Sequence, residues 1–173
     1  MKKLLIICLS LFTSFAVSAQ STIEDANAEK RAVAAFHSVK VTDGIDLHLV
    51  QGNEESVAVS ASREEYRSRI RTVVEDGVLR ISYNRETLGD WTSGGKKLKA
   101  YVSVKSLRKL TASAGAAVVL QETLKLNETH MYLNSGAQLR GQLEVGKLVL
   151  EIESGAAATI KGAAGELHVN ANS

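Results

Sequence analysis

The chain has 173 residues, with 13 Gly, no Pro, one Cys and 5% aromatic residues. At the usual frequency of ~5%, about eight or nine prolines would be expected, so collagen, Pro-rich linkers and polyproline ligands are excluded. Apolar residues make up 45% of the chain and charged residues 23%, a balance that argues against global disorder and favours one folded domain. Because proline cannot donate a backbone hydrogen bond, its absence also fits a chain rich in paired strands.

The first nineteen residues have the pattern of a secretory signal peptide. Two lysines precede an apolar run over residues 4–15, and small residues at 17–19 place the cleavage before Gln20. Cys8 lies inside the apolar run, which argues against a lipid anchor there. We therefore expect a protein exported through the cytoplasmic membrane to the periplasm, the cell surface or the medium, with no transmembrane segment.

Removal of the signal peptide changes the charge and the cysteine content. Without Lys2 and Lys3 the 21 basic residues fall to 19, which equals the 19 acidic residues. The mature chain then has no net charge and no Cys, so neither nucleic-acid binding nor a disulfide framework is expected. A hydrophobic core must supply its stability.

The mature chain divides into a short arm and one β-rich domain. Residues 20–35 are polar and Ala-rich and suggest an arm or a short helix outside the core, whereas residues 36–173 form the domain. From residue 36 apolar side chains alternate with polar ones, which is typical of half-buried strands. A tight hairpin at Asp43-Gly44 would pair apolar with polar side chains, so a longer turn or a corner between two sheets is expected there.

Asp76-Gly77 gives the clearest hairpin signal. A two-residue turn there puts six side chains on one face, in the pairs Val74–Leu79, Thr72–Ile81 and Ile70–Tyr83. Capping-box spacing from Ser62 to Glu65 predicts a single helical turn over 63–69. The polar loop that follows, residues 84–97, holds the only Trp, and alternation predicts a further strand over 98–104.

From Leu110 onward the sequence repeats weakly, with a Gly at the end of each short strand. The expected structural corners are Gly115, Gly136 and Gly155, spaced by 21 and 19 residues. Alignment on these glycines predicts two inward rows and a second short strand after each corner. The inward rows are Leu110/Met131/Leu150/Leu167 and Ala112/Leu133/Ile152/Val169, and the second strand places Val118, Leu139 and Ile160 in register.

A period of about 20 residues with a Gly corner predicts an all-β fold in the form of a right-handed β-solenoid, a β-helix-like stack of repeats. An antiparallel β-sandwich is the alternative, because the same short strands would serve it. The sequence stops where a fourth Ser-Gly-Ala corner would fall. We therefore expect either an incomplete last coil or a chain that continues past Ser173.

Three of these features carry a resemblance to a known family. Gly44-Ile45-Asp46 with the strand that ends at Gln51-Gly52, the hairpin at residues 75–79 and the serial Ser-Gly-Ala corners resemble the bacterial family "putative auto-transporter adhesin, head GIN domain". The resemblance covers about residues 36–173. It implies an extracytoplasmic β-helical domain of unknown function, and it supplies no catalytic residues.

One predicted surface has the composition of a ligand-binding face. If residues 98–104 form a strand, a row of basic and aromatic side chains points outward: Lys97, Lys99, Tyr101 and Lys105. Such a stripe could bind anionic glycans or lipid headgroups. The alternative is a solvated strand or an edge strand, on which lysines block aggregation.

No residues form a recognisable catalytic or metal-binding motif. His37, His48, His130 and His168 lack the spacing of a zinc site, and no cofactor is expected. Glu151 and Glu153 share an outward face, as acidic pairs do in carbohydrate-active β-helices, but no basic partner is expected beside them.

The sequence therefore favours a non-enzymatic envelope or surface module that acts in adhesion or glycan binding. An anionic glycan or another envelope component is the expected partner. A carbohydrate-active enzyme and a purely structural envelope module are the alternatives.

Overall fold

The computed structural model describes residues 25–85 and 95–172, so the predicted signal peptide and Trp91 lie outside the described residues. In these ranges the regular structure is almost all β, with eleven strands in one sheet and a four-residue helix, α1 (Glu64–Arg67). The strands are β1 (Glu29–Arg31), β2 (Ser38–Val41), β3 (Asp46–Gln51), β4 (Ser56–Ser60), β5 (Ile70–Glu75), β6 (Val78–Tyr83), β7 (Lys99–Val104), β8 (Lys109–Ala112), β9 (Ala117–Leu133), β10 (Gln138–Glu153) and β11 (Ala157–Asn172). No described helix has the length and apolar character needed to cross a membrane.

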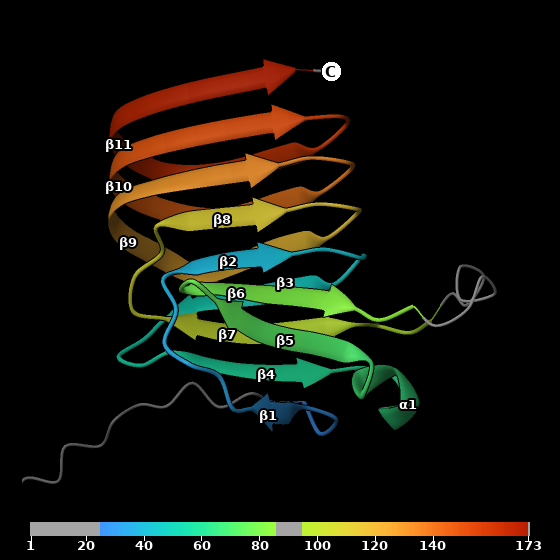
Figure 1. Cartoon of the computed structure of the whole chain (residues 1–173). Coiled ribbons are helices and arrows are strands. Elements are labelled where there is room, and N and C mark those ends of the chain that lie inside the picture. Colours follow the sequence, from blue (N-terminus) through green and yellow to red (C-terminus); the bar gives the residue numbers. More distant parts are fainter. Residues whose placement is uncertain (1–24, 86–94, 173) are drawn as a thin grey trace, which may run out of the picture.

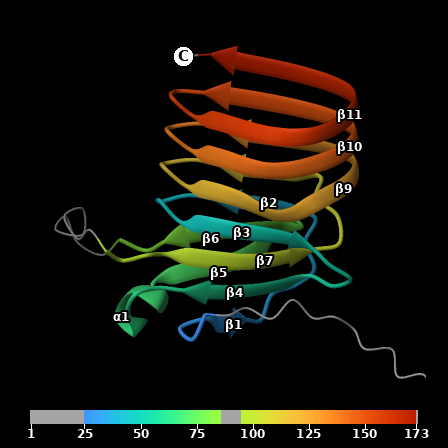
Figure 2. The same cartoon turned by 180° about the vertical axis from the view of Figure 1, so that it is seen from behind.

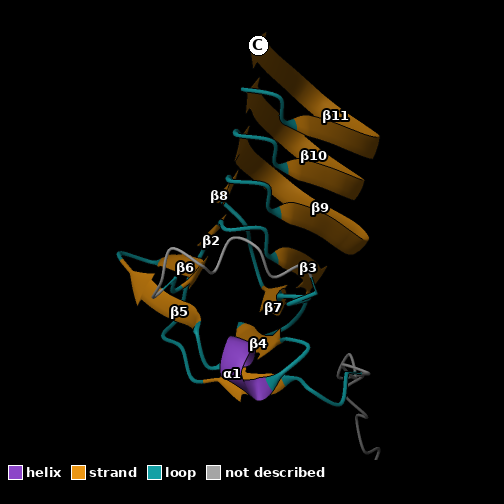
Figure 3. Cartoon of the chain, turned by 90° about the vertical axis from the view of Figure 1, so that its right-hand side faces the viewer, coloured by secondary structure: helices purple, strands orange, loops and turns teal. Residues whose placement is uncertain are grey.

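The sheet folds into two walls that enclose the core. The front wall in Figure 1 contains β8, β2, β6 and β5 side by side. The back wall, which faces the viewer in Figure 2, contains β3, β7, β4 and β1. The long strands β9, β10 and β11 bend, as Figure 3 shows, so that each contributes its first half to the back wall and its second half to the front wall.

The core between the walls is built by period-two alternation. In β7 every second residue is buried, and Leu47 and Leu49 of β3 are fully buried, as are Leu110 of β8 and Met131 of β9. Because side chains alternate across a strand, the other residues of β7, namely Lys99, Tyr101 and Ser103, lie on the outer side of the wall. The predicted strand over 98–104 is confirmed as β7.

Four corners with the same backbone conformation join the two walls. Gly115, Gly136 and Gly155 have φ values of 73°, 75° and 75°. The residue before each Gly is also left-handed, and the same pair of conformations occurs at Asp43-Gly44, with φ values of 63° and 67°.

These corners lie one above another. The N–H of Gly44 donates to the carbonyl of Ala114 at 3.0 Å, and the N–H of Gly115 donates to that of Ser135 at 3.0 Å. A corner at Asp43-Gly44 is one of the two arrangements that the register conflict predicts. Its position beneath the other three corners is not predicted from the sequence.

The hairpin prediction is confirmed residue by residue. β5 and β6 pair antiparallel with Val74 opposite Leu79, Thr72 opposite Ile81 and Ile70 opposite Tyr83. The helical turn expected over 63–69 is α1, but its N-cap is Arg63 and no side chain caps it, so the capping box predicted from Ser62 is wrong. Within the segment predicted to be an arm, β1 forms and pairs antiparallel with β4.

The C-terminal stack, which we define as β8 to β11 (residues 109–172), pairs in parallel throughout. Leu110 lies opposite Met131, and Met131 opposite Leu150, as the sequence alignment predicts. Parallel pairing between successive strands differs from the antiparallel pairing that a β-sandwich would need.

The predicted register of the last strand is wrong by two residues. Leu150 lies opposite Val169, not Leu167, and Leu139 lies opposite Ala158, not Ile160. The offset of 19 residues between β10 and β11 is shared by Gly146 and Gly165. A Cβ on Gly165 would lie 2.8 Å from the carbonyl oxygen of Gly146, so the two backbones approach closely there.

Candidate ligand-binding faces

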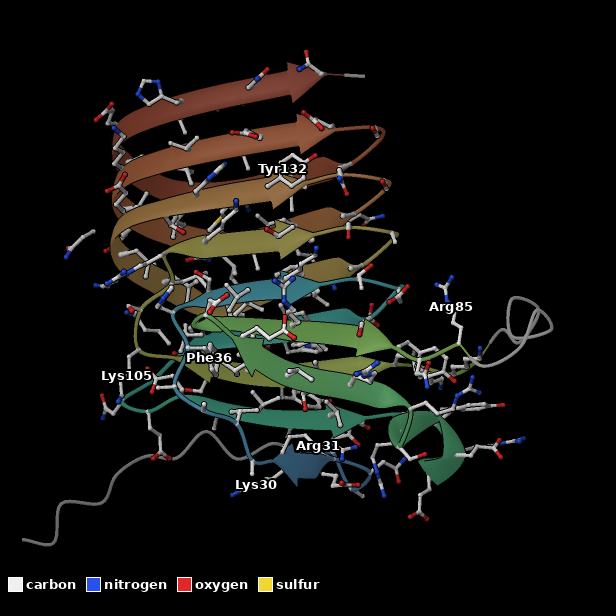
Figure 4. The ribbon with its side chains drawn as sticks, viewed as in Figure 1. Lys30, Arg31, Phe36, Arg85, Lys105 and Tyr132 are labelled. Atoms are coloured by element: carbon white, nitrogen blue, oxygen red, sulfur yellow. The ribbon has the colours of Figure 1, made fainter. Side chains whose placement is uncertain are left out.

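The basic face, defined as Lys97, Lys99, Tyr101 and Lys105, lies on the outside of the back wall. β7 carries Lys99 and Tyr101 and pairs with β3 on one side and β4 on the other. It is therefore an inner strand, and protection of an exposed edge does not explain its lysines. Lys97 precedes the strand and is exposed, and Lys105 follows it and projects at the side of the molecule in Figure 4.

An internal carboxylate occupies the centre of the basic face. The hydroxyl of Tyr101 donates to Oδ2 of Asp25 at 2.7 Å, and Nζ of Lys99 lies 3.8 Å from the same oxygen. Lys105 pairs with Glu55, with 3.3 Å between Nζ and Oε2. Two of the three lysines thus already have a carboxylate partner within the chain.

The ionisation of Asp25 and Tyr101 reflects this contact. The hydrogen bond from Tyr101 lowers the pKa of Asp25 most, and the backbone of Asn27 lowers it further. Burial, followed by the hydrogen bond to Asp25, raises the pKa of Tyr101 to about 12. The pair is therefore a neutral phenol that donates to an ionised carboxylate over the whole physiological range.

His48 extends the basic face across β3. Its ring stacks on that of Tyr101, with centroids 5.1 Å apart and planes inclined by 24°. Burial lowers the pKa of His48, and the charge of Lys99 lowers it further, so the imidazole is neutral near pH 7. Nδ1 of His48 is 2.5 Å from Nε2 of Gln121 on the neighbouring strand.

The polar ladder, defined as His130, Tyr132, Glu151 and Glu153, lies on the outside of the front wall. Tyr132, labelled in Figure 4, donates its hydroxyl to Oε2 of Glu153 at 2.7 Å. Nε2 of His130 lies 3.0 Å from Oε1 of Glu151. The hydrogen bond to Glu153 raises the pKa of Tyr132.

The histidine beside Glu151 was not foreseen from the sequence, where no basic partner was expected. His130 and Glu151 are diagonal neighbours, because Glu151 lies directly opposite Tyr132 and His130 is two residues earlier on the same face. Cross-strand diagonals bring long side chains within reach. Alignment of the strands on their corner glycines places Glu151 opposite Tyr132, and this register could have revealed the diagonal contact with His130.

Outward-facing polar side chains form a row across four strands of the stack. Thr111 of β8, Tyr132 of β9, Glu151 of β10 and Asn170 of β11 are opposite one another in turn. Neighbouring strands lie about 4.8 Å apart. The outer face therefore presents hydroxyl, carboxylate and amide groups at regular intervals along a line.

Both carboxylates of the polar ladder have partners on β9. Glu151 is engaged by His130, and Glu153 by Tyr132. In the described part of the chain no group of three His, Cys, Asp or Glu side chains could hold a metal ion.

The chain matches one family of known proteins over most of its length. The model of a family described as "Putative auto-transporter adhesin, head GIN domain" matches residues 35–173. The comparison with curated proteins gives no match.

Several solved structures share the fold. A putative adhesin from Parabacteroides merdae ATCC 43184 is 22% identical with a TM-score of 0.60, and the match covers 84% of this chain and 58% of that one. A putative adhesin from Parabacteroides distasonis ATCC 8503 is 22% identical with a TM-score of 0.58, over 83% of this chain and 68% of that one. A putative lipid binding protein from the same strain is 15% identical with a TM-score of 0.52, over 85% and 76% of the two chains. The chain thus spans little more than half of the P. merdae protein, and at these identities the likeness concerns the fold.

Proposed function

Since the chain belongs to the family of putative auto-transporter adhesins with a head GIN domain, we propose that it is an exported, non-enzymatic surface module that binds glycans. Its family and the predicted signal peptide support a location at the cell surface or in the envelope. Adhesion is the role that a glycan-binding module would serve there.

The proposed architecture of the module is a right-handed β-solenoid. The in-register parallel pairing of β9, β10 and β11 and the stacked corners at Gly115, Gly136 and Gly155 support it. In such a stack, equivalent positions of successive coils form straight rows on the outer face.

The single observation that carries the binding proposal is the row Thr111, Tyr132, Glu151 and Asn170 across the front wall. Sugar hydroxyls both donate and accept hydrogen bonds, and carboxylate, amide and phenol groups satisfy them. The spacing of about 4.8 Å between rungs is close to the length of one sugar unit. A linear glycan that crosses the strands would therefore meet one rung for each sugar.

The ladder is also held in place before a ligand arrives. Asn134 donates to the Tyr132 hydroxyl at 3.1 Å, and that hydroxyl donates to Glu153. Because these side chains are already fixed by one another, a ligand loses less conformational entropy in ordering them.

The basic face remains a second proposed ligand face, for anionic glycans. Lys97 is exposed beside it, but Asp25 occupies the position that a ligand carboxylate or sulfate would take between Tyr101 and Lys99. We therefore assign the principal ligand to the polar ladder.

Retention on an array of bacterial envelope and host glycans tests the proposal. We expect the purified chain to bind a linear glycan and the ladder variant Tyr132→Ala/Glu151→Gln to lose most of this retention. The matched double variant Lys99→Ala/Lys105→Ala, on the opposite wall, should keep it.

Three outcomes would contradict the proposal. Loss of retention only in the lysine variant would move the ligand to the basic face. Absence of retention by the unmodified chain would remove the binding function. Turnover of the glycan that is abolished by Glu151→Gln would show a carbohydrate-active enzyme instead.

A further inference from the structure

The row that contains Thr111 and Tyr132 continues beyond β8 across the front wall. Lys40 of β2, which is exposed between two buried valines, lies opposite Thr111, and Arg80 of β6 lies opposite Lys40. Figure 1 shows β8, β2 and β6 side by side in this order. The outer face of the front wall therefore changes along the row from a carboxylate on β10 to cations on β2 and β6.

Lys109 of β8 brings a second positive charge beside Thr111. It is exposed, lies two residues before Thr111 on the same face and pairs in register with His130. Because Lys40 lies opposite Thr111, Lys40 and Lys109 are diagonal cross-strand neighbours, a separation that long side chains can span. An anion beside Thr111 would therefore meet both ammonium groups, which we call the lysine pair.

Neither member of the lysine pair has a carboxylate partner within residues 25–85 and 95–172. Arg80, the neighbour of Lys40, is already paired with Glu75, with 2.8 Å between Nε and Oε2. Four lysines elsewhere on the sheet have a carboxylate oxygen between 3.3 and 3.8 Å from Nζ: Lys99, Lys105, Lys125 and Lys147. The lysine pair is thus the part of the front wall whose positive charge is not neutralised by the protein itself.

The stability of the sheet does not explain the lysine pair. Lys40 lies directly opposite Arg80, and like charges directly opposite in a sheet are destabilising. β2 pairs with β6 and β8, and β8 pairs with β2 and β9, so both are inner strands and protection of an edge is not the reason. Charges that are unfavourable for the fold and lie in register with a binding row point to a ligand of opposite charge.

The opposite charges at the two ends of the row give the ligand a direction. Glu151 lies opposite Tyr132, so an anionic group over β10 would be repelled by a carboxylate. Lys40 lies on the other side of Tyr132, two strands away, at about 9.6 Å for a strand spacing of about 4.8 Å. With one sugar for each strand, the favoured place for an anionic group is two sugars from the sugar at Tyr132.

We propose that the ligand of this face is a linear glycan with an acidic end. Its carboxylate-bearing sugar lies over the lysine pair, and its neutral sugars cross Tyr132 and Glu151. This inference rests on the proposed function, because it assigns the chemical class and the direction of the glycan at the same site. An ammonium group is a point charge that binds a carboxylate without a fixed geometry, so a terminal sialic acid and a terminal uronic acid both fit.

An array of matched glycan pairs tests the proposal. Each pair consists of a linear neutral chain and the same chain ending in sialic acid or in glucuronic acid. We expect the acidic member to bind at least about fivefold more tightly at about 0.15 M salt, since it adds two exposed ion pairs. This advantage should vanish at about 1 M salt, where the screening length is only about 3 Å. Comparison of the two kinds of acidic end shows which sugar the site prefers.

Two variants of the lysine pair locate the acidic end. Lys40→Gln/Lys109→Gln removes the charges but keeps long polar side chains, so it should abolish the difference between acidic and neutral glycans. Lys40→Arg/Lys109→Arg keeps the charges and should keep the difference. The matched control is Lys30→Gln/Lys161→Gln, which removes the same charge from two exposed lysines outside the front wall and should also keep it. Circular dichroism establishes that each variant is folded.

Three results would overturn the inference. Equal affinity of the unmodified chain for the acidic and neutral members of every pair would remove the acidic end and leave the proposed glycan function intact. A difference that survives in Lys40→Gln/Lys109→Gln, or is lost equally in the control, would show that the lysine pair does not hold the acid. Binding of neither member of any pair would remove both the acidic end and the glycan function.

Discussion

The two halves of the molecule bury their apolar side chains with different arrangements of strands. In the N-terminal half, β2 lies between β6 and β8, which are far from it in sequence, and β1, β4 and β5 add antiparallel pairs at the outside. In the C-terminal stack each strand lies beside the next one in the chain, always in parallel. Among the described strands, the outermost one of the first half on the front wall is β5 of the β5–β6 hairpin, whereas the outermost one of the second half is β11, which pairs with β10 alone.

This difference separates strands that depend only on their neighbour in the sequence from strands that depend on distant parts of the chain. In the stack, each added strand needs only its predecessor and a glycine at the bend. In the N-terminal half, Leu47 and Leu49 are fully buried on β3, which pairs with β7 and β9, two strands far from it in the sequence. Loss of packing should therefore be global in the first half and confined to the end in the second.

The largest expected effect comes from core truncation at the closed end. Leu47→Ala should lower the free energy of unfolding by about 2–5 kcal/mol, because a fully buried side chain leaves a cavity. Leu167→Ala, the same change at the open end, should cost less than about 1 kcal/mol since that side chain is 57% exposed. Urea unfolding measures both. Equal losses would show that the two ends do not differ.

At the bends of the stack, the effect of a mutation on stability should depend on backbone conformation and close backbone approach rather than on side-chain burial. Gly141 has φ 149°, and a Cβ there would overlap Cβ of Leu120. Gly141→Ala should therefore cost about 2–3 kcal/mol.

The corner glycine Gly136 is the matched control for this change. It has φ 75°, and no atom lies within 4 Å of the place that a Cβ would take, so Gly136→Ala should cost only about 1 kcal/mol. Thermal unfolding of the two variants compares them. A larger loss at Gly136 would contradict this description of the bends.

The contact between Asp25 and Tyr101 predicts a pH dependence specific to the N-terminal half. Because the folded chain raises the pKa of Tyr101 from 10.0 to about 12, its protonated form is favoured by folding. The resulting stability is present below pH 10 and is lost as the pH rises from 10 towards 12. In Tyr101→Phe this alkaline loss should be smaller, as measured by urea unfolding across that range.

On the acid side the sign is reversed. The pKa of Asp25 is lowered below 3.8, so its contribution is present above that value and is lost as the pH falls further. Asp25→Asn should flatten the acid loss. Unchanged profiles in both variants would show that the contact contributes nothing to folding.

The smallest expected effect concerns the charge of the basic face. Asp25→Asn removes the internal partner of Tyr101 and Lys99, so the variant should elute later from a heparin column than the unmodified chain. Asp46→Asn, the same charge change at an exposed residue beside Lys99 in register, is the matched control. Equal delays in both variants would show that only net charge matters.

The sequence allowed prediction of structure wherever a turn fixed the register. The hairpin at Asp76-Gly77 was predicted in full, because six side chains could share one face in one register only. Val169 was misplaced, because the last strand lacks a corner of its own in the sequence and was aligned on its apolar pattern. The spacing of Gly146 and Gly165 gives the correct offset.

The candidate faces were predictable to different degrees. The outward positions of Lys99 and Tyr101 followed from strand alternation. The position of Asp25 against Tyr101 could not be predicted, because 76 residues and several loops separate them. His130 beside Glu151 could have been found from the register of the stack.

The most direct test of the proposed function is the affinity for oligosaccharides of increasing length, prepared from a linear glycan that the chain retains. The row Thr111, Tyr132, Glu151 and Asn170, with one side chain on each of four strands, predicts that affinity rises by at least about tenfold from the monosaccharide to the tetrasaccharide, which corresponds to about 1.4 kcal/mol. It also predicts that Tyr132→Ala/Glu151→Gln removes this rise. A monosaccharide that binds as tightly as the tetrasaccharide, or a length dependence that survives in the ladder variant, would contradict the assignment of the glycan to this face.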